Sequence, residues 1–316
     1  MRRLSILVVV AIVCFAAACR NNATAPSDTN LPFTVSPLAL SNIEYITPLG
    51  NLNPPDHTLP TDHIYFYHHL SPQHRNLPEF EVVAPAGGRV SEVRRESDDV
   101  LVVQVTSKVS YKLAHVLLDA GIAKGQSIQA GQRLGTTSPE AGGLDLGVTN
   151  NDITLGFVRP ARYQAESLHC DKPLTFFSDE LRPQLYALVT GVVGDKDGRI
   201  DFDQRGTLAG NWYHESVPVD DSPSRTWGPW HLSFVREPTD ASKIRISMGG
   251  TIAEAGVYAI GADNPDPASV TVQSGAVTFN ITGGKSGKTS GPMQVEMQSD
   301  TKIRITFAGT SNTYVR

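Results

Sequence analysis

The sequence has few cysteines and no cluster of basic residues. Its 316 residues include 3 cysteines, which are Cys14, Cys19 and Cys170. Cys14 lies inside an N-terminal apolar run and Cys19 follows that run. Cys170 is therefore left without a partner, and no disulfide framework is expected. Lys and Arg number 27 against 32 Asp and Glu, a formal net charge of −5. This balance, without a basic cluster, argues against a nucleic-acid partner.

The N-terminal apolar run is too short to cross a membrane. It extends from Leu4 to Phe15, whereas a spanning helix needs about 20 apolar residues. Arg2-Arg3 precede the run and Ala16-Ala17-Ala18 follow it. A positive start, an apolar centre and small residues before a cleavage site are typical of an export signal. We expect residues 1–19 to be such a signal.

The end of this signal, Ala17-Ala18-Cys19, resembles that of bacterial lipoproteins. The resemblance implies that Cys19 is lipidated and anchors the chain to a membrane of the bacterial cell envelope, facing the periplasm or the surface. Ala16 departs from the pattern, because Leu or Val is usual three positions before the cysteine. Ordinary secretion with cleavage near Ala18 is the alternative. Residues 20–42, rich in Asn, Thr, Pro, Ser and Ala, predict a flexible tether.

Helical periodicity is rare in the rest of the chain. Between Ile43 and about Pro160, and again over 193–316, short apolar segments alternate with Gly, Pro and Asn turns, which predicts an all-β protein. Leu181, Leu185 and Leu188 predict one short bridging helix. We expect a β domain over 43–165, a bridge over 166–192 and a β-sandwich or small barrel over 193–316. Strands of this second domain are expected at 206–213, 230–236, 243–247, 256–260, 269–273, 277–281, 293–297 and 302–307.

The motifs of the first domain follow a specific order. They are Val83-Ala84-Pro85-Ala86-Gly87-Gly88-Arg89-Val90, Tyr111 to His115, Gly125-Gln126-Ser127-Ile128-Gln129-Ala130-Gly131-Gln132-Arg133-Leu134-Gly135 and Leu144-Asp145-Leu146-Gly147-Val148. Together they resemble the M23 (LytM, lysostaphin-type) peptidase domain over residues 46–160. Lipoyl-like carriers share this kind of β fold, but a carrier needs an exposed lysine at a hairpin tip, and no lysine is flanked in that way.

The resemblance implies a set of site residues. In the M23 family, an early His and Asp and a late His-x-His strand bind zinc and activate water, together with a His from a middle strand. His57 and Asp62 match the first two ligands, although four residues separate them where three are usual. His115 matches the catalytic histidine of the middle strand. The last pair falls on Gly143-Leu144-Asp145, so both histidines are missing and Asp145 stands in the place of the third ligand.

This altered set changes the expected chemistry. Imidazole and carboxylate both bind Zn²⁺ and other divalent metals, so His57, Asp62 and Asp145 predict a metal site. The added carboxylate weakens the acidification of bound water, and a lost acid/base group costs about 10²–10⁴ in rate. A domain without any metal is the other expectation. His63 is a spare candidate that ranks lower, because strand alternation counted from Asp62 turns it to the opposite face.

Two functions remain open. One is an envelope lipoprotein whose incomplete M23-like domain binds cell-wall peptide, glycan or an envelope protein without efficient hydrolysis. The other is a zinc-dependent peptidoglycan endopeptidase. Asp145 separates them: metal-bridging distance to His57 and Asp62 favours the enzyme, and pairing with a basic side chain favours the binding protein. A structural protein whose groove is closed by the segment 68–78 is a third possibility.

Overall fold

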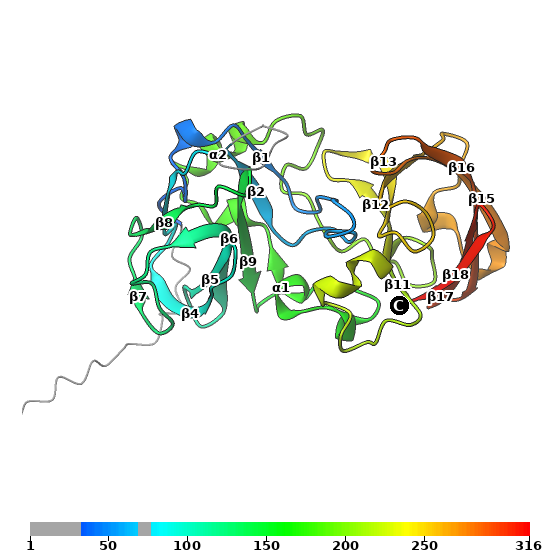
Figure 1. Ribbon diagram of the computed structural model, residues 1–316, viewed down its shortest axis with the longest axis horizontal. Helices are drawn as coiled ribbons and strands as arrows, with labels where there is room; N and C mark the ends of the chain where they lie inside the picture. Colours follow the sequence, from blue (N-terminus) through cyan, green and yellow to red (C-terminus); the bar gives the residue numbers. More distant parts are fainter. Residues whose placement is uncertain (1–32, 69–76) are drawn as a thin grey trace, which may run out of the picture.

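The computed structural model describes residues 33–68 and 77–316. They form two β units that lie next to each other in Figure 1, an open sheet followed by a closed barrel. The predicted all-β class is thereby confirmed. The export signal, Cys19 and most of the segment 68–78 lie outside the described residues. No helix in the described part of the chain is long and apolar enough to cross a membrane.

The first unit is built on a ten-stranded antiparallel sheet. Its main path runs β1-β2-β9-β6-β5-β4-β7, while β3, β8 and β10 pair at its sides. The bounds are β1 Tyr45–Thr47, β2 Ile64–Tyr67, β3 Glu81–Val83, β4 Gly88–Arg94, β5 Asp99–Gln104, β6 Val109–Leu118, β7 Ser127–Ile128, β8 Arg133–Thr137, β9 Gly143–Asn150 and β10 Cys170–Asp171.

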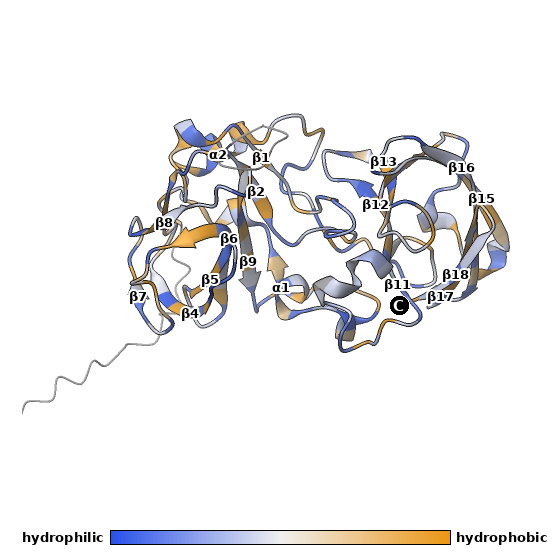
Figure 2. Cartoon of the chain, in the orientation of Figure 1, coloured by the Kyte–Doolittle hydropathy of each residue, from blue (hydrophilic) through white to orange (hydrophobic). Residues whose placement is uncertain are grey.

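The core of this unit lies against the sheet. Residues of β5 alternate between buried and half-buried, as the period of two in a strand requires. In Figure 2, β2 and β6 stand out as hydrophobic strands. Phe66, Leu101, Tyr111 and Leu146 are fully buried there, so the two strands that will carry the site, β2 and β9, are fixed by the core beneath them.

Segments beyond the expected domain limits join the same core. Phe33 and Leu38 are fully buried, and Phe33 forms a backbone bridge with Phe177. The prediction of a tether as far as residue 42 is therefore wrong from Phe33 onward, because apolar side chains of this stretch pack against the sheet. The bridging helix is α2 (Arg182–Leu188), and its Leu185 is buried in this core too. A second short helix, α1 (Ala165–Leu168), precedes β10.

The second unit is a closed barrel of eight antiparallel strands in chain order. The first and last strands, β11 and β18, pair and close it, which decides between the predicted sandwich and barrel. Its strands are β11 Gly210–His214, β12 His231–Glu237, β13 Asp240–Met248, β14 Gly256–Ile260, β15 Ala276–Gly283, β16 Thr289–Ser299, β17 Lys302–Phe307 and β18 Thr310–Val315.

The barrel differs from the prediction in two strands, one expected but absent and one present but not expected. The segment 269–273 forms no strand but belongs to the short turns η5 (Pro267–Ser269) and η6 (Val272–Ser274). Thr271 and Ser274 form a capping box there, each side chain bonded to the other's backbone, which holds the chain in a turn. The closing strand β18 was not predicted, because its polar sequence shows little apolar alternation.

Arg316 holds the barrel closed. It is 2% exposed, and its guanidinium lies 4.0 Å from the ring centroid of Trp212 on β11. It donates hydrogen bonds to the backbone carbonyls of Gln204, Thr207 and Asn211. A buried cation is stable only when its donors are satisfied, so these bonds fix the C-terminal residue against the first strand.

A loop of the first unit folds back on itself. Gly50 donates its backbone N–H to Thr61, and Asn53 and His57 exchange two backbone hydrogen bonds of 2.9 and 3.0 Å. We call residues 49–61 the lobe. It precedes β2 directly, so it lies at the edge of the sheet where β1 and β2 pair.

The lobe also contacts the barrel. Thr58, 1% exposed, donates to the carbonyl of Gly228 at 2.9 Å in the turn η4 (Arg225–Trp230). The carbonyl of Thr58 accepts from Ser233 of β12 at 3.2 Å. A Cβ atom at Gly228 would overlap the carbonyl oxygen of Pro55, so a glycine is required for this close approach. The barrel therefore fixes the position of the lobe.

Candidate functional site

The candidate site is centred on Asp145 in the middle of the sheet. Asp145 pairs in register with Tyr65 of β2 and with Ala114 of β6. It is 4% exposed. Its Oδ2 lies 3.4 Å from Nε2 of His63 and 3.4 Å from Nε2 of His115. The sequence prediction that Asp145 belongs to a site of chemically active residues agrees with this placement, but its partners are not the ones expected.

His63, not Asp62, faces Asp145. The residues of β2 that share a face are counted from Tyr65, which lies opposite Asp145. Two residues earlier on that face is His63. The expectation that His63 points away was wrong, because Asp62 precedes the strand and does not set its alternation. Nε2 of His63 also lies 3.1 Å from the hydroxyl of Tyr65, and Nδ1 lies 3.0 Å from Asp62.

Asp62 lies behind His63. Its Oδ1 contacts His63, and its Oδ2 accepts from Ser167 at 2.6 Å. Nζ of Lys112 is 3.9 Å away. Burial alone would raise the pKa of Asp62, but the charge of Lys112 and the hydrogen bonds from His63 and Ser167 outweigh it and hold the pKa well below its usual range. Asp62 is therefore an anion that orients His63.

A bulge in β6 brings His115 to the same point. Ala114 pairs with Val100 and Val116 with Asp99, so His115 has no partner in β5. Its φ is 60°, in the left-handed region, which is rare and costly outside glycine. In a regular strand His115 and Ala114 would face opposite sides. The extra residue instead turns the imidazole toward Asp145.

His115 has a second carboxylate partner that the sequence did not reveal. Its Nδ1 lies 2.9 Å from Oδ2 of Asp98, and Ser138 donates its hydroxyl to the other oxygen of Asp98. Asp98 lies in the turn before β5, and an acidic residue in a turn is a weak signal by itself. Only the pairing of β5 with the bulged strand brings it to His115.

These contacts form one continuous polar chain. It runs from Asp62 through His63, Asp145 and His115 to Asp98. A metal ligand must offer a free nitrogen lone pair. In this chain a carboxylate faces each ring nitrogen of His63 and of His115.

The predicted metal set is not assembled. Among the described residues no group of three or more His, Cys, Asp and Glu side chains is placed to hold a metal ion. His57 lies with its ring 5.5 Å from that of His63, edge to face, while Asp62 and Asp145 bond to opposite nitrogens of His63. In this arrangement His57, Asp62 and Asp145 do not converge on one point, so their role as a ligand set stays a prediction that the geometry does not support.

A cavity of about 520 Å³ opens beside this chain. The lobe forms one wall and the sheet the other, and the lining residues are Asn51, Leu52, Asn53, Asp56, His57, Tyr65, Tyr67 and His115. The volume lies within the range of about 300–1,000 Å³ that is typical of small-molecule sites. His57 and His115, both predicted as site residues, thus meet at the cavity.

Three tyrosines form a row along the sheet wall. Tyr45 and Tyr67 pair across β1 and β2, and their rings stack with centroids 4.6 Å apart and an interplanar angle of 12°. The rings of Tyr67 and Tyr65 stack at 5.7 Å and 24°. The sequence alone does not bring Tyr45 to this row, because its place depends on the register of β1 against β2. The row leads from the edge of the sheet into the cavity.

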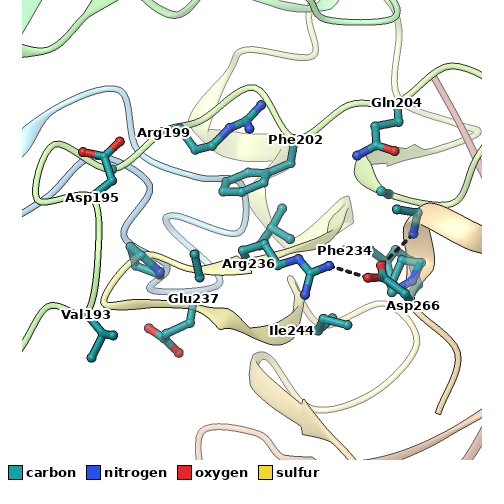
Figure 3. A pocket seen from close by; sticks show the side chains of 17 residues that line it. Val193, Asp195, Arg199, Phe202, Gln204, Phe234, Arg236, Glu237, Ile244 and Asp266 are labelled. Atoms are coloured by element: carbon teal, nitrogen blue, oxygen red, sulfur yellow. Dashed lines mark hydrogen bonds and ion pairs between the residues drawn. The ribbon is translucent and has the colours of Figure 1, made fainter.

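A second, smaller cavity of about 220 Å³ lies between the linker 193–209 and the barrel. Figure 3 shows Phe202 on one side of it and Arg236 bonded to Asp266 on the other. The charged side chains that line this cavity are paired with protein groups, in the pairs Arg236 with Asp266, Glu237 with Arg245, Asp195 with Lys172 and Arg199 with Asp201. The first cavity is taken as the candidate site because His115 and Tyr65, which lie next to Asp145, line it.

Comparison with known proteins gives matches among solved structures. Neither a protein-family model nor a curated protein matches the chain. Helicobacter pylori Csd3 matches with a TM-score of 0.32 and 16% identity, over 46% of this chain and 35% of that chain. The catalytic domain of lysostaphin from Staphylococcus simulans matches with a TM-score of 0.29 and 15% identity, over 43% and 93% of the two chains. Pseudoalterin, a deep-sea M23 metalloprotease, matches with a TM-score of 0.29 and 16% identity, over 48% and 90%.

Solved structures of M23 peptidases thus match part of this chain. The prediction of an M23-like domain, made from the motifs at 83–148, is confirmed to that extent. The identities and TM-scores are low, and this chain spans about a third of Csd3. The likeness therefore concerns the fold and carries no statement about reaction, ligand or partner. The chemistry of the M23-like unit rests on its own residues.

Proposed function

We propose that the M23-like unit binds peptidoglycan at the cavity beside Tyr65 and Tyr67 without hydrolysing it. The observation that supports this proposal is the pairing of Asp145 with His63 and His115. Asp145 takes the place of a third metal ligand in the resemblance, and in this chain it pairs with two imidazoles. A cavity with a polar and aromatic lining lies beside this pairing, which supports binding as the role of the unit.

The proposed setting is the bacterial cell envelope. The ending Ala17-Ala18-Cys19 supports a lipid anchor on Cys19, and the anchor would hold the M23-like unit near the wall. Growth with a labelled fatty acid tests this part: label should appear on the protein and disappear in a Cys19→Ser variant. Label on neither protein would contradict the anchor and leave ordinary secretion.

The binding function is tested with purified cell-wall sacculi. The protein should sediment with sacculi and release no soluble muropeptides during prolonged incubation. An Asn53→Ala variant should sediment less, because Asn53 is an exposed cavity residue, and Asn280→Ala on the exposed barrel surface serves as the matched control. Release of muropeptides by the unaltered protein would contradict the proposal and favour an endopeptidase. Failure to sediment would leave an envelope protein as the partner.

A further inference from the structure

We infer that the cavity recognises the glycan strand of the wall, an uncharged chain of N-acetylated hexoses, and not its peptides. This inference rests on the proposed cell-wall function and deepens it by naming the part of the wall that is bound. It departs from the reaction class of the M23 family, whose enzymes act on peptide bonds. Three features of the cavity lining support it: its charge, its hydrogen-bonding groups and its aromatic row.

The charge of the lining does not suit a peptide of the wall. Such peptides carry free carboxylates, and proteins recognise carboxylates with Arg or Lys donors. Among the described residues, no Lys or Arg lines the cavity. Asp56, exposed at its rim, would repel a carboxylate. Lys112 lies toward Asp62, and His115 already has two carboxylate partners.

The hydrogen-bonding groups of the lining match a sugar chain. Hydroxyl and acetamido groups both donate and accept, and so do the amides of Asn51 and Asn53 on the lobe. Tyr67 adds a phenolic hydroxyl from the sheet, whereas the hydroxyl of Tyr65 already bonds to His63. Burial, followed by the neighbouring Tyr45 and Asp145, raises the pKa of Tyr67 to about 12. The phenol therefore stays neutral in the physiological range and keeps both its donor and its acceptor.

The aromatic row matches the shape of such a chain. Tyr45, Tyr67 and Tyr65 form one stack along β1 and β2, and β1 is the edge strand of the sheet path. Sugar rings present apolar C–H groups that pack against aromatic surface. A repeating strand that enters over Tyr45 would meet the row first and the amides of the lobe next.

The test is direct binding of two soluble probes to the purified protein, measured by calorimetry. The first probe is a β-1,4-linked hexamer of N-acetylglucosamine, and the second is a cross-linked stem peptide freed of sugar. The hexamer should bind and the peptide should not. Tyr67→Ala and Asn53→Ala should each weaken hexamer binding at least about tenfold, while Asn280→Ala, on the exposed barrel surface, should not change it.

Tyr67→Phe separates the roles of ring and hydroxyl. The ring of Tyr67 stacks on two neighbours, so Tyr67→Ala also disturbs local packing. Tyr67→Phe keeps the stack, and binding should fall between the wild type and Tyr67→Ala. Asn53→Ala supplies an independent reading, because the backbone of Asn53 makes the hydrogen bonds of the lobe and its side chain is exposed.

The outcomes distinguish this inference from the proposed function. Binding of the stem peptide without the hexamer overturns the glycan inference and leaves cell-wall binding intact. Binding of neither probe by a protein that still sediments with sacculi also overturns it. Equal hexamer binding by the wild type, Tyr67→Ala and Asn53→Ala would place the sugar elsewhere and contradict the assignment to this cavity. Failure to sediment with sacculi is the separate result that removes the proposed function.

Discussion

His231 shows how burial of one residue ties barrel stability to pH. It is 7% exposed and its Nε2 has no hydrogen-bond partner among the described residues. Burial, with the nearby charge of Arg162, lowers the pKa of His231 from 6.5 to about 4. The unfolded chain therefore takes up the proton first. The contribution of His231 to the free energy of unfolding is therefore fully present above about pH 6.5. It decreases as the pH falls toward 4, by up to about 3 kcal/mol.

A His231→Gln variant tests this dependence. Its free energy of unfolding, from urea denaturation between pH 4 and 7, should vary less with pH than that of the wild type. His214→Gln is the matched control, because the ring of His214 bonds to Ser216 at the surface. If the free energy of unfolding depends on pH equally in the wild type and in His231→Gln, another group causes the loss of stability at acid pH.

Asp145 should matter more for stability than a surface carboxylate. An Asp145→Asn variant replaces the buried carboxylate that lies 3.4 Å from Nε2 of His63 and of His115, and the expected loss is about 3 kcal/mol in the free energy of unfolding. Asp152→Asn removes a carboxylate that is 58% exposed and pairs with Lys108, and it should cost less than about 1 kcal/mol. Similar losses in the two variants, measured by denaturant titration, would contradict a buried network at Asp145.

At the residue level the sequence predicted part of the site. Asp145 and His115 were expected there, because the motifs of their strands could be recognised in the sequence. The structure places the two residues together. His63 was ranked below Asp62, since the first residue of β2 was not known and the count of alternation began one residue too early. Asp98 was missed because its contact with His115 depends on a bulge, and no local pattern predicts a bulge of this kind.

At the element level, the contact between the lobe and the turn η4 is open to a direct test. Gly228→Ala would force its Cβ against the carbonyl oxygen of Pro55, and the backbone must move apart at a cost of about 1–3 kcal/mol. Because the lobe carries Asn53 and His57, sacculus binding should weaken as well. Gly156→Ala is the control, since a Cβ there meets nothing within 4 Å. Unchanged stability and binding in Gly228→Ala would show that the barrel does not fix the lobe.

Element bounds followed the sequence where apolar alternation was strong. The strands β14 and β17 begin and end at the expected residues. The strand β18 was not predicted, because its sequence is polar and its pairing with β17 and β11 stabilises it. The segment 269–273 was predicted as a strand because of Val270 and Val272. It forms a turn because local side-chain hydrogen bonds from Thr271 and Ser274 favour one.

At the level of the whole molecule, the two units should unfold together. Arg162 of the first unit is 3% exposed. It donates to the carbonyl of Val217 at 3.3 Å and lies 4.6 Å from the ring centroid of Tyr213. All three tryptophans are in the barrel unit, so tryptophan fluorescence follows that unit alone while far-ultraviolet circular dichroism follows both. The two thermal transitions should coincide.

An Arg162→Ala variant should separate these two transitions, because it removes the hydrogen bond and the ring contact that cross between the units. Lys243→Ala, whose partner Asp240 lies in the same barrel strand, should leave them coincident. Separate transitions in the wild-type protein would contradict a single cooperative unit.

The direct contacts among Asp62, His63, Asp145, His115 and Asp98 imply that this polar chain holds no metal. Zinc content and zinc titration of the protein purified without chelators test it most directly. The chain Asp62, His63, Asp145, His115 and Asp98 predicts no stoichiometric zinc and no saturable binding, in the wild type or in Asp145→Ala. One equivalent of tightly bound zinc, lost in Asp145→Ala, would contradict the account and make the endopeptidase the better function.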